Sequence, residues 1–329
     1  MSQLQKFLFD GMPVRGVAVR LTDAWQEVVQ RRAANSHSGP YAPAVTGLLG
    51  EMTAAACLMQ ANIKFNGALI LQMQGDGPVK VAVAEVLPDL ALRATATVLG
   101  SIPEDATLST LVNQHGKGRC AITLDPRDRL PGQQPYQGIV PLSDAQEMPL
   151  PDVAQALQHY MRQSEQLDTT LVLAADDHVA AGLLIQRLPL EGEANLAGST
   201  GNAGDEAQAE AAEHYHRIVT LAQSLTREEL LGLDIDTILH RLFWDEKLLR
   251  FAPADSDPVP HFACTCSTER VSAMIRSLGR EEADSILAEQ GRIEVGCEFC
   301  GKQYRFDPVE AARIFVPAEA RPPASDTVH

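Results

Sequence analysis

Two short stretches hold four of the six cysteines in this 329-residue chain: His261-Phe-Ala-Cys264-Thr-Cys266-Ser267 and Val295-Gly-Cys297-Glu-Phe-Cys300-Gly301. Two close pairs separated by a longer insert have the spacing of a zinc site, because each pair supplies two thiolates from one loop. The alternatives are buried core cysteines or structural disulfides. Buried cysteines rarely occur as two pairs, and nothing in the chain indicates secretion. We therefore expect Cys264, Cys266, Cys297 and Cys300 to bind one Zn²⁺ per chain in the reduced protein.

The first cysteine pair is unusually tight. C-x-C lies below the usual gap of two to four residues, so the site is not an ordinary finger or ribbon. Four thiolates complete a tetrahedron, whereas a catalytic zinc keeps one position open for water. The alternative is that His261 replaces one thiolate and leaves a sulfur free. We expect a closed site with four cysteine ligands.

The sequence around the cysteines predicts a small domain over residues 261–316. Ser267 is a suitable N-cap for a helix that ends at Gly279. Residues 292–295 and 303–306 are predicted to form a hairpin around the second pair, and Asp307-Pro-Val-Glu310 starts a last helix. Large apolar residues are few, so we expect this domain to need its metal to fold. Residues 317–329 contain several prolines and are predicted to be a disordered tail.

Residues 1–190 have the pattern of an α+β domain. Residues 43–60 are predicted to form a helix that is apolar or small almost all round, which is typical of a helix in the middle of a core. After Lys64 the hydrophobic period changes to two, and residues 65–74, 79–87 and 90–99 are predicted as successive antiparallel strands. We expect antiparallel strands around a buried helix, with Cys57 and Cys120 in the core.

Residues 191–260 are predicted to be a linker in two parts. Residues 191–213 are rich in Gly, Ala, Asn and acidic residues without periodicity, and we expect a flexible insertion there. Helices are predicted for residues 214–225 and 236–251, with a capping box at Thr226-Arg-Glu-Glu229 between them. These helices are amphipathic but too few for a core of their own, so we expect them to pack on the first domain. Residues 253–260 form the boundary before the cysteine-containing domain.

Composition excludes several classes of function. The formal net charge of −16 argues against a nucleic-acid or anionic-membrane partner, because phosphate groups require a basic surface. The N-terminus has no apolar stretch typical of a signal peptide, and no membrane span is expected, so we predict a cytoplasmic protein. The first domain has no recognisable catalytic motif, and we expect no enzyme activity. Two alternatives are a zinc module for nucleic acids, which the charge opposes, and a thiol oxidoreductase using Cys297 and Cys300. In thioredoxin-like enzymes, however, that motif opens a helix rather than lying in a hairpin.

The chain resembles the redox-regulated heat-shock holdase chaperones, the thirty-three-kilodalton heat-shock protein (HslO) family, over nearly its whole length. The most specific features are the C-x-C and C-x-x-C pairs and the Gln-Gly-Asp-Gly-Pro turn. The full set of matching stretches is Gly47-Leu-Leu-Gly-Glu51, Ile63-Lys-Phe65, Leu71-Gln-Met-Gln-Gly-Asp-Gly-Pro78, Tyr136-Gln-Gly-Ile-Val140, Tyr160 with Ser164-Glu-Gln-Leu167, Cys264-Thr-Cys266-Ser-Thr-Glu-Arg270 and Cys297-Glu-Phe-Cys300. The insertion near residues 194–209 and the long tail depart from the family pattern, which puts the length of the linker in doubt.

The resemblance implies an ATP-independent chaperone that is inactive when reduced and zinc-bound. In that family, oxidation joins the cysteines within each pair, here Cys264–Cys266 and Cys297–Cys300. Zinc then leaves, and the zinc domain and linker unfold to expose a surface for unfolding client proteins. The resemblance also allows a homodimer in the oxidised form. Cys57 and Cys120 match no functional position of the family, and the client-binding residues are unknown. If the linker is released, we expect its apolar faces, with Leu230, Leu231, Leu242 and Phe243, to contribute to client binding.

Overall fold

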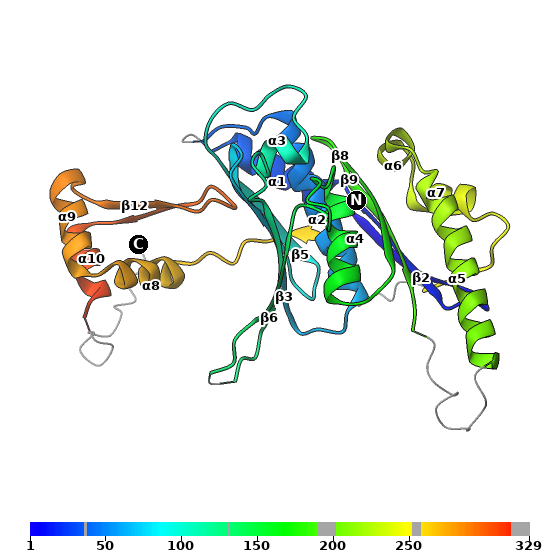
Figure 1. The fold of residues 1–329 in the computed structure, drawn as a ribbon. Coiled ribbons are helices and arrows are strands. Elements are labelled where there is room, and N and C mark those ends of the chain that lie inside the picture. Colours follow the sequence, from blue (N-terminus) through cyan, green and yellow to red (C-terminus); the bar gives the residue numbers. More distant parts are fainter. Residues whose placement is uncertain (36–37, 131, 190–201, 252–257, 317–329) are drawn as a thin grey trace. The chain divides into compact units, whose positions relative to one another are not determined.

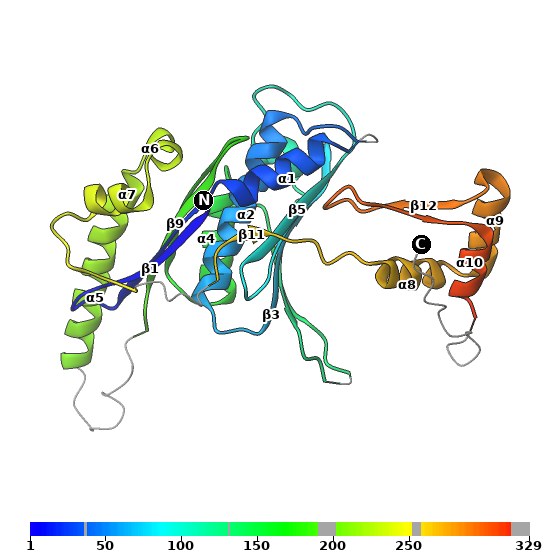
Figure 2. The same cartoon turned by 180° about the vertical axis from the view of Figure 1, so that it is seen from behind.

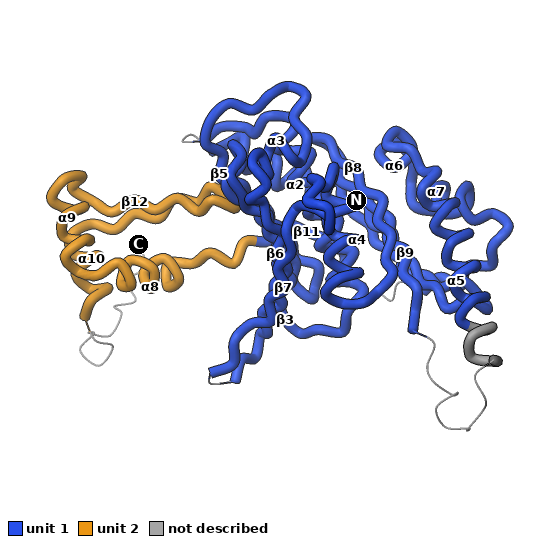
Figure 3. The backbone as a smooth tube through the Cα atoms, viewed as in Figure 1, with its two compact units in different colours: residues 1–263 blue, residues 264–329 orange. Residues whose placement is uncertain are grey.

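The computed structural model describes residues 1–35, 38–130, 132–189, 202–251 and 258–316, without the side chains of residues 202–207. The chain divides into two compact units, an N-terminal unit, Met1–Ala263, and a C-terminal unit, Cys264–His329 (Figure 3). The predicted tail and residues 191–201 of the predicted flexible insertion lie outside the described residues.

The N-terminal unit contains two sheets. Sheet A has the order β10-β1-β2-β9-β8, and sheet B has the order β11-β5-β4-β3-β6-β7. All neighbours are antiparallel except β11 and β5. The strands are β1 Gln3–Phe9, β2 Val14–Leu21, β3 Gly67–Gln74, β4 Val79–Val86, β5 Ala91–Val98, β6 Arg119–Pro126, β7 Tyr136–Pro141, β8 Thr169–Ala175, β9 Ala180–Arg187, β10 Leu248–Arg250 and β11 His261–Phe262.

Helix α2, Pro43–Asn62, lies between the two sheets (Figure 1). Its residues are buried nearly all round, as its composition predicts, because it contacts strands of both sheets. By length and composition this helix could also cross a membrane, although no membrane span was predicted from the sequence. However, 78% of its apolar window is buried inside the unit, so its apolar surface is already covered by protein. The expectation of antiparallel strands around a buried helix is confirmed.

Three further helices surround this interior. Helix α1, Asp23–Ala33, contributes Trp25 and Val28 to it, and helix α4, Val153–Ser164, contributes Leu157 and Tyr160. The short helix α3, Leu108–Val112, was not predicted from the sequence. Cys57 on α2 and Cys120 on β6 are fully buried, which confirms their expected place in the core.

The helical linker, defined here as residues 202–243 with α5 Asn202–Gln223, α6 Arg227–Gly232 and α7 Ile235–Leu242, packs against the face of sheet A that points away from α2 (Figures 1 and 2). Ile218, Leu239 and Phe243 of the linker share one buried cluster with Phe7 and Ile185 of the sheet. This packing confirms that the linker leans on the first domain. Leu230 and Phe243 are buried, whereas Leu231 and Leu242 are partly buried.

Two predictions about the linker are wrong. Residues 202–213 are helical rather than part of a flexible insertion, because α5 begins at Asn202. A helix was also predicted to continue to residue 251, but α7 ends at Leu242 and residues 248–250 form β10. The backbone of β10 pairs with β1, which supplies the hydrogen bonds that a helix would otherwise have provided.

The C-terminal unit contains helices α8 Thr268–Leu278, α9 Arg280–Gln290 and α10 Pro308–Ile314 and the hairpin β12 Ile293–Gly296 with β13 Gln303–Phe306. Ser267 caps α8 by accepting a hydrogen bond from the Arg270 N–H, and Asp307 with Glu310 forms a capping box at α10. Its small core centres on Ile275, Ile293, Tyr304 and Phe306. Helices α8 and α10 and the hairpin lie where the sequence predicts them.

Candidate metal centre

The four cysteines of the two predicted pairs lie in two loops of the C-terminal unit. Cys264 and Cys266 lie in the extended segment that follows β11 and leads into α8. Cys297 and Cys300 lie in the turn between β12 and β13. This turn is closed by hydrogen bonds from the Cys297 N–H to the Lys302 carbonyl (2.9 Å) and from the Gly301 N–H to the Cys297 carbonyl (2.8 Å). Gly301 has a φ of 72°, a left-handed conformation that favours glycine.

The sulfur atoms of these four cysteines converge. All four lie within 4.8 Å of one another, with 3.6 Å between Cys264 and Cys297 and 3.4 Å between Cys266 and Cys300. A tetrahedral zinc with Zn–S bonds of about 2.3 Å places neighbouring sulfurs about 3.8 Å apart. The donor set and its spacing therefore fit a metal ion with four thiolate ligands. Within the described ranges, the group contains no fifth ligand, and the Nδ1 atom of His261 instead lies 2.9 Å from the Val259 carbonyl oxygen.

The surroundings of the cluster act on the ionisation of its thiols. Burial opposes ionisation of Cys266, but the neighbouring Tyr304 hydroxyl and the other three thiols outweigh it and lower its pKa to about 7. Burial raises the pKa of Cys297 and Cys300. The closeness of the Cys266 thiol, followed by burial, raises the pKa of Tyr304. Four thiols this close thus favour ionisation of one of them, because the other three can donate hydrogen bonds to its thiolate. A cation bound among them would favour ionisation of the others as well.

The loop between Cys264 and Cys266 is held by α8. Arg270 on the first turn of α8 donates a hydrogen bond from Nη1 to the Thr265 hydroxyl (2.6 Å). Its backbone N–H donates to the Ser267 hydroxyl (3.3 Å). The packing of α8 therefore orients the first cysteine pair. Tyr304 and Arg270 both lie in stretches that were noted for their cysteines, but their contacts with the site were not predicted.

The two remaining cysteines are unlike the cluster. Cys57 and Cys120 are completely buried in the N-terminal unit, and burial raises the pKa of each to about 12. A thiol with so high a pKa is protonated near neutrality and reacts poorly with oxidants. Both are packing residues.

Comparison with known proteins gives one consistent family. The family model described as "Hsp33 protein" matches residues 2–307. The 33 kDa chaperonin of Chromobacterium violaceum is 44% identical over 313 residues, covering 95% of this chain and 93% of that protein. The 33 kDa chaperonin of Neisseria meningitidis serogroup A is 41% identical over 312 residues, covering 94% and 90%. The crystal structure of the 33 kDa chaperonin from Thermotoga maritima has a similar fold, with a TM-score of 0.69 at 19% identity, covering 94% of this chain and 97% of that chain.

Proposed function

Because the chain belongs to the Hsp33 family of chaperones, we propose that it is a redox-regulated, ATP-independent holdase that binds unfolding proteins under oxidative stress. The observation that carries this proposal is the cluster of four thiols in a unit with a small apolar core. Bound Zn²⁺ would hold the four sulfurs as thiolates and join the segment before α8 to the β12–β13 turn. The reduced, metal-bound form is the inactive one.

The proposed switch is the oxidation of each cysteine pair. Hydrogen peroxide oxidises one thiolate to a sulfenic acid, and the neighbouring thiol then condenses with it, so that two thiols and one peroxide give one disulfide and two waters. A sulfur in a disulfide is no longer an anionic ligand, so the four-thiolate set is lost. The free energy of metal binding, on the order of 10 kcal/mol, then no longer supports folding of the C-terminal unit.

We propose the pairing Cys264–Cys266 and Cys297–Cys300. The interatomic distances do not select it, since all four sulfurs lie within 4.8 Å and the 3.6 Å and 3.4 Å contacts join one cysteine of each pair. The reason is chain connectivity, because residues two or three positions apart stay close when the unit unfolds, whereas the two loops separate. Peptide mapping after oxidation should recover the two short loops. Mainly Cys266–Cys300 or Cys264–Cys297 peptides would contradict this pairing.

Client binding would follow from release of the helical linker. The linker covers one face of sheet A with Leu239 and Phe243 among others. The chain after β10 returns to the N-terminal unit at β11, directly before Cys264, so unfolding of the C-terminal unit loosens the far end of the linker. Undocking would expose an apolar face of the linker and the matching face of sheet A. We propose that these two faces bind clients in the cytoplasm, that the oxidised protein forms homodimers, and that it catalyses no reaction on its clients.

The test is to measure zinc content and suppression of client aggregation on one sample before and after peroxide. Zinc release and activity should rise together, and reductant with added zinc should reverse both. Activity that is equally high in the reduced, zinc-loaded protein would contradict the redox switch. Two assays separate the alternatives: reduction of insulin would indicate a thiol oxidoreductase, and a salt-dependent gel shift would indicate nucleic-acid binding.

A further inference from the structure

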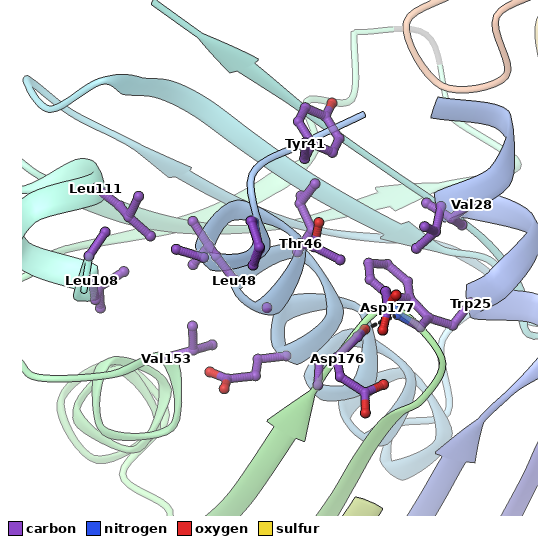
Figure 4. Close-up of a pocket in the computed structure, with 18 of the residues that line it drawn as sticks. Trp25, Val28, Tyr41, Thr46, Leu48, Leu108, Leu111, Val153, Asp176 and Asp177 are labelled. Atoms are coloured by element: carbon purple, nitrogen blue, oxygen red, sulfur yellow. Dashed lines mark hydrogen bonds between the residues drawn. The ribbon is translucent and has the colours of Figure 1, made fainter. Parts of the chain in front are cut away.

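A cavity of about 680 Å³ opens beside the first half of α2, outside the regions assigned above (Figure 4). Its wall is largely apolar and comes from several elements, with Trp25 and Val28 on α1, Leu48 on α2, and Leu108 and Leu111 on α3 (Figure 4). Val153, at the start of α4, completes it. A space of this size with an apolar wall fits one or two large side chains of another polypeptide.

An arginine of the linker reaches this cavity. Arg227, the first residue of α6, donates a hydrogen bond from Nη2 to the carbonyl oxygen of Ala175 at the end of β8. Its Nη1 lies 3.9 Å from Oε1 of Glu51, whose side chain is only 22% exposed. Both acceptors belong to the walls of the cavity. The guanidinium comes from α6, which is released with the rest of the linker under the proposed function. The position between Glu51 and the Ala175 carbonyl therefore accepts a guanidinium group.

The other charged groups around the cavity are mostly acidic. Asp152, Asp176 and Asp177 line it together with Glu51, and its second cation is Arg32, whose guanidinium stacks over the ring of Tyr41 at 3.9 Å. With Arg227 in place, two cations face four carboxylates. When α6 undocks, one cation remains, and the partly buried Glu51 loses the cation that lies 3.9 Å away.

We propose that this cavity is a subsite for an arginine or lysine side chain of a client, flanked in the client by large apolar residues, and that Arg227 occupies the subsite while the linker is docked. The inference rests on the proposed function, because the subsite becomes available when α6 is released. A guanidinium from a client would take the place of Arg227 between the Glu51 carboxylate and the Ala175 carbonyl. Its apolar neighbours would cover the wall formed by Trp25 and the α3 leucines.

The preference for a cation can be measured with two fluorescent peptides that differ only in charge. Each is a short extended segment of Leu and Phe around one central residue, which is arginine in one peptide and neutral citrulline in the other. At pH 8, where the Glu51 carboxyl is ionised, oxidised full-length protein should bind the arginine peptide on the order of tenfold more tightly, since a charge-assisted hydrogen bond in a partly buried site is lost with citrulline. In Glu51→Gln this ratio should fall to about one. In Glu289→Gln, which removes the same charge from an exposed position on α9, the ratio should stay as in the wild type.

A second variant tests the role of Arg227 without relying on oxidation. Reduced, zinc-loaded Arg227→Gln should bind the arginine peptide on the order of tenfold more tightly than the reduced wild type does, because the subsite is no longer filled from within. Equal binding of the two peptides by oxidised wild type, an unchanged ratio in Glu51→Gln, or no gain in Arg227→Gln would each overturn the proposal. Failure of the proposed function is a different result: the oxidised wild type would then suppress no aggregation at all. Circular dichroism melting verifies that each variant is folded.

Discussion

The interior around α2 and the core of the C-terminal unit differ in how much buried apolar surface each has to stabilise it. The first joins more than forty buried residues from two sheets and several helices, and the second joins eight among the residues described. Burial of apolar surface must offset the conformational entropy of every ordered residue. We expect the larger core to do so by itself and the smaller one to need the metal ion that its four cysteines could hold. Under the proposed function, four cysteines in place of a larger core would make the stability of the C-terminal unit depend on redox chemistry.

The helical linker lies between these extremes. Its buried cluster draws about equally on the linker and on the outer face of sheet A, so neither surface is covered when the other leaves. We therefore expect that the linker can be released without unfolding the interior around α2. This intermediate position suits a segment that controls access to a binding surface.

The largest effect should come from removing the metal. Chelation of the reduced protein, or Cys297→Ser, should raise deuterium exchange throughout the described C-terminal unit, because about 10 kcal/mol of binding free energy is lost from its folding. Exchange in α2 and in β3 to β5 should stay low. As the control, Cys120→Ala should keep the zinc and lose only about 1 kcal/mol of stability. Persistent protection of α8 without metal would mean that its small core is sufficient.

A substitution in the linker should release it without touching the cysteines. The Phe243 ring is 2% exposed and contacts the Phe9 ring edge-on at a centroid distance of 5.0 Å. Phe243→Ala should cost about 3–5 kcal/mol of docking free energy and give chaperone activity in the reduced, zinc-bound protein. Trp244 is 74% exposed, so Trp244→Ala should do neither. A Phe243→Ala protein whose linker exchanges freely but which stays inactive would separate linker release from activation.

Glu51, an ionisable residue on α2 beside the larger core, should make the stability of the N-terminal unit depend on pH. Burial raises the pKa of Glu51 from 4.5 to about 7, against the opposing charge of Arg227 and with a smaller contribution from Asp152. Between these two values the unfolded carboxyl ionises while the folded one stays protonated, so stability falls as pH rises from about 4.5 to 7 and then levels off. Glu51→Gln should therefore gain at most about 3 kcal/mol near pH 8 and nothing near pH 4. Equal gains at both pH values in urea titrations would assign the effect to packing.

A helix cap provides the smallest and most specific test of the coupling between folding and metal binding. Ser267→Ala removes the side-chain acceptor at the start of α8, which should cost about 1 kcal/mol. Because metal binding and folding of this unit are linked, the apparent zinc affinity should fall by about fivefold in a competition with a chelating dye. Ser285→Ala, at an exposed position within α9, should leave the affinity unchanged. No difference between the two variants would indicate that the unit is already folded before it binds zinc.

Local sequence signals predicted much of the fold because the decisive interactions are local. The strands predicted at residues 65–74, 79–87 and 90–99 contain β3, β4 and β5, and the caps at Ser267, Thr226 and Asp307 form as predicted. The missed elements depend on distant partners. No strand was predicted for Gln3–Phe9, and a helix was predicted over the residues of β10, yet these two segments pair with each other. A two-residue strand such as β11 has no sequence signal of its own, since its pairing with β5 defines it.

The sequence by itself determined the donor set of the candidate metal centre, because two pairs of thiols need only their own loops to point at one ion. It also determined the burial of α2, whose apolar circumference leaves no face for water. Only the tertiary structure decided what covers sheet A, how α8 holds the first cysteine pair through Arg270 and Thr265, and that Arg227 meets Glu51 across 176 positions of the chain. Such contacts depend on side chains brought together by packing, and spacing along the chain carries no record of them.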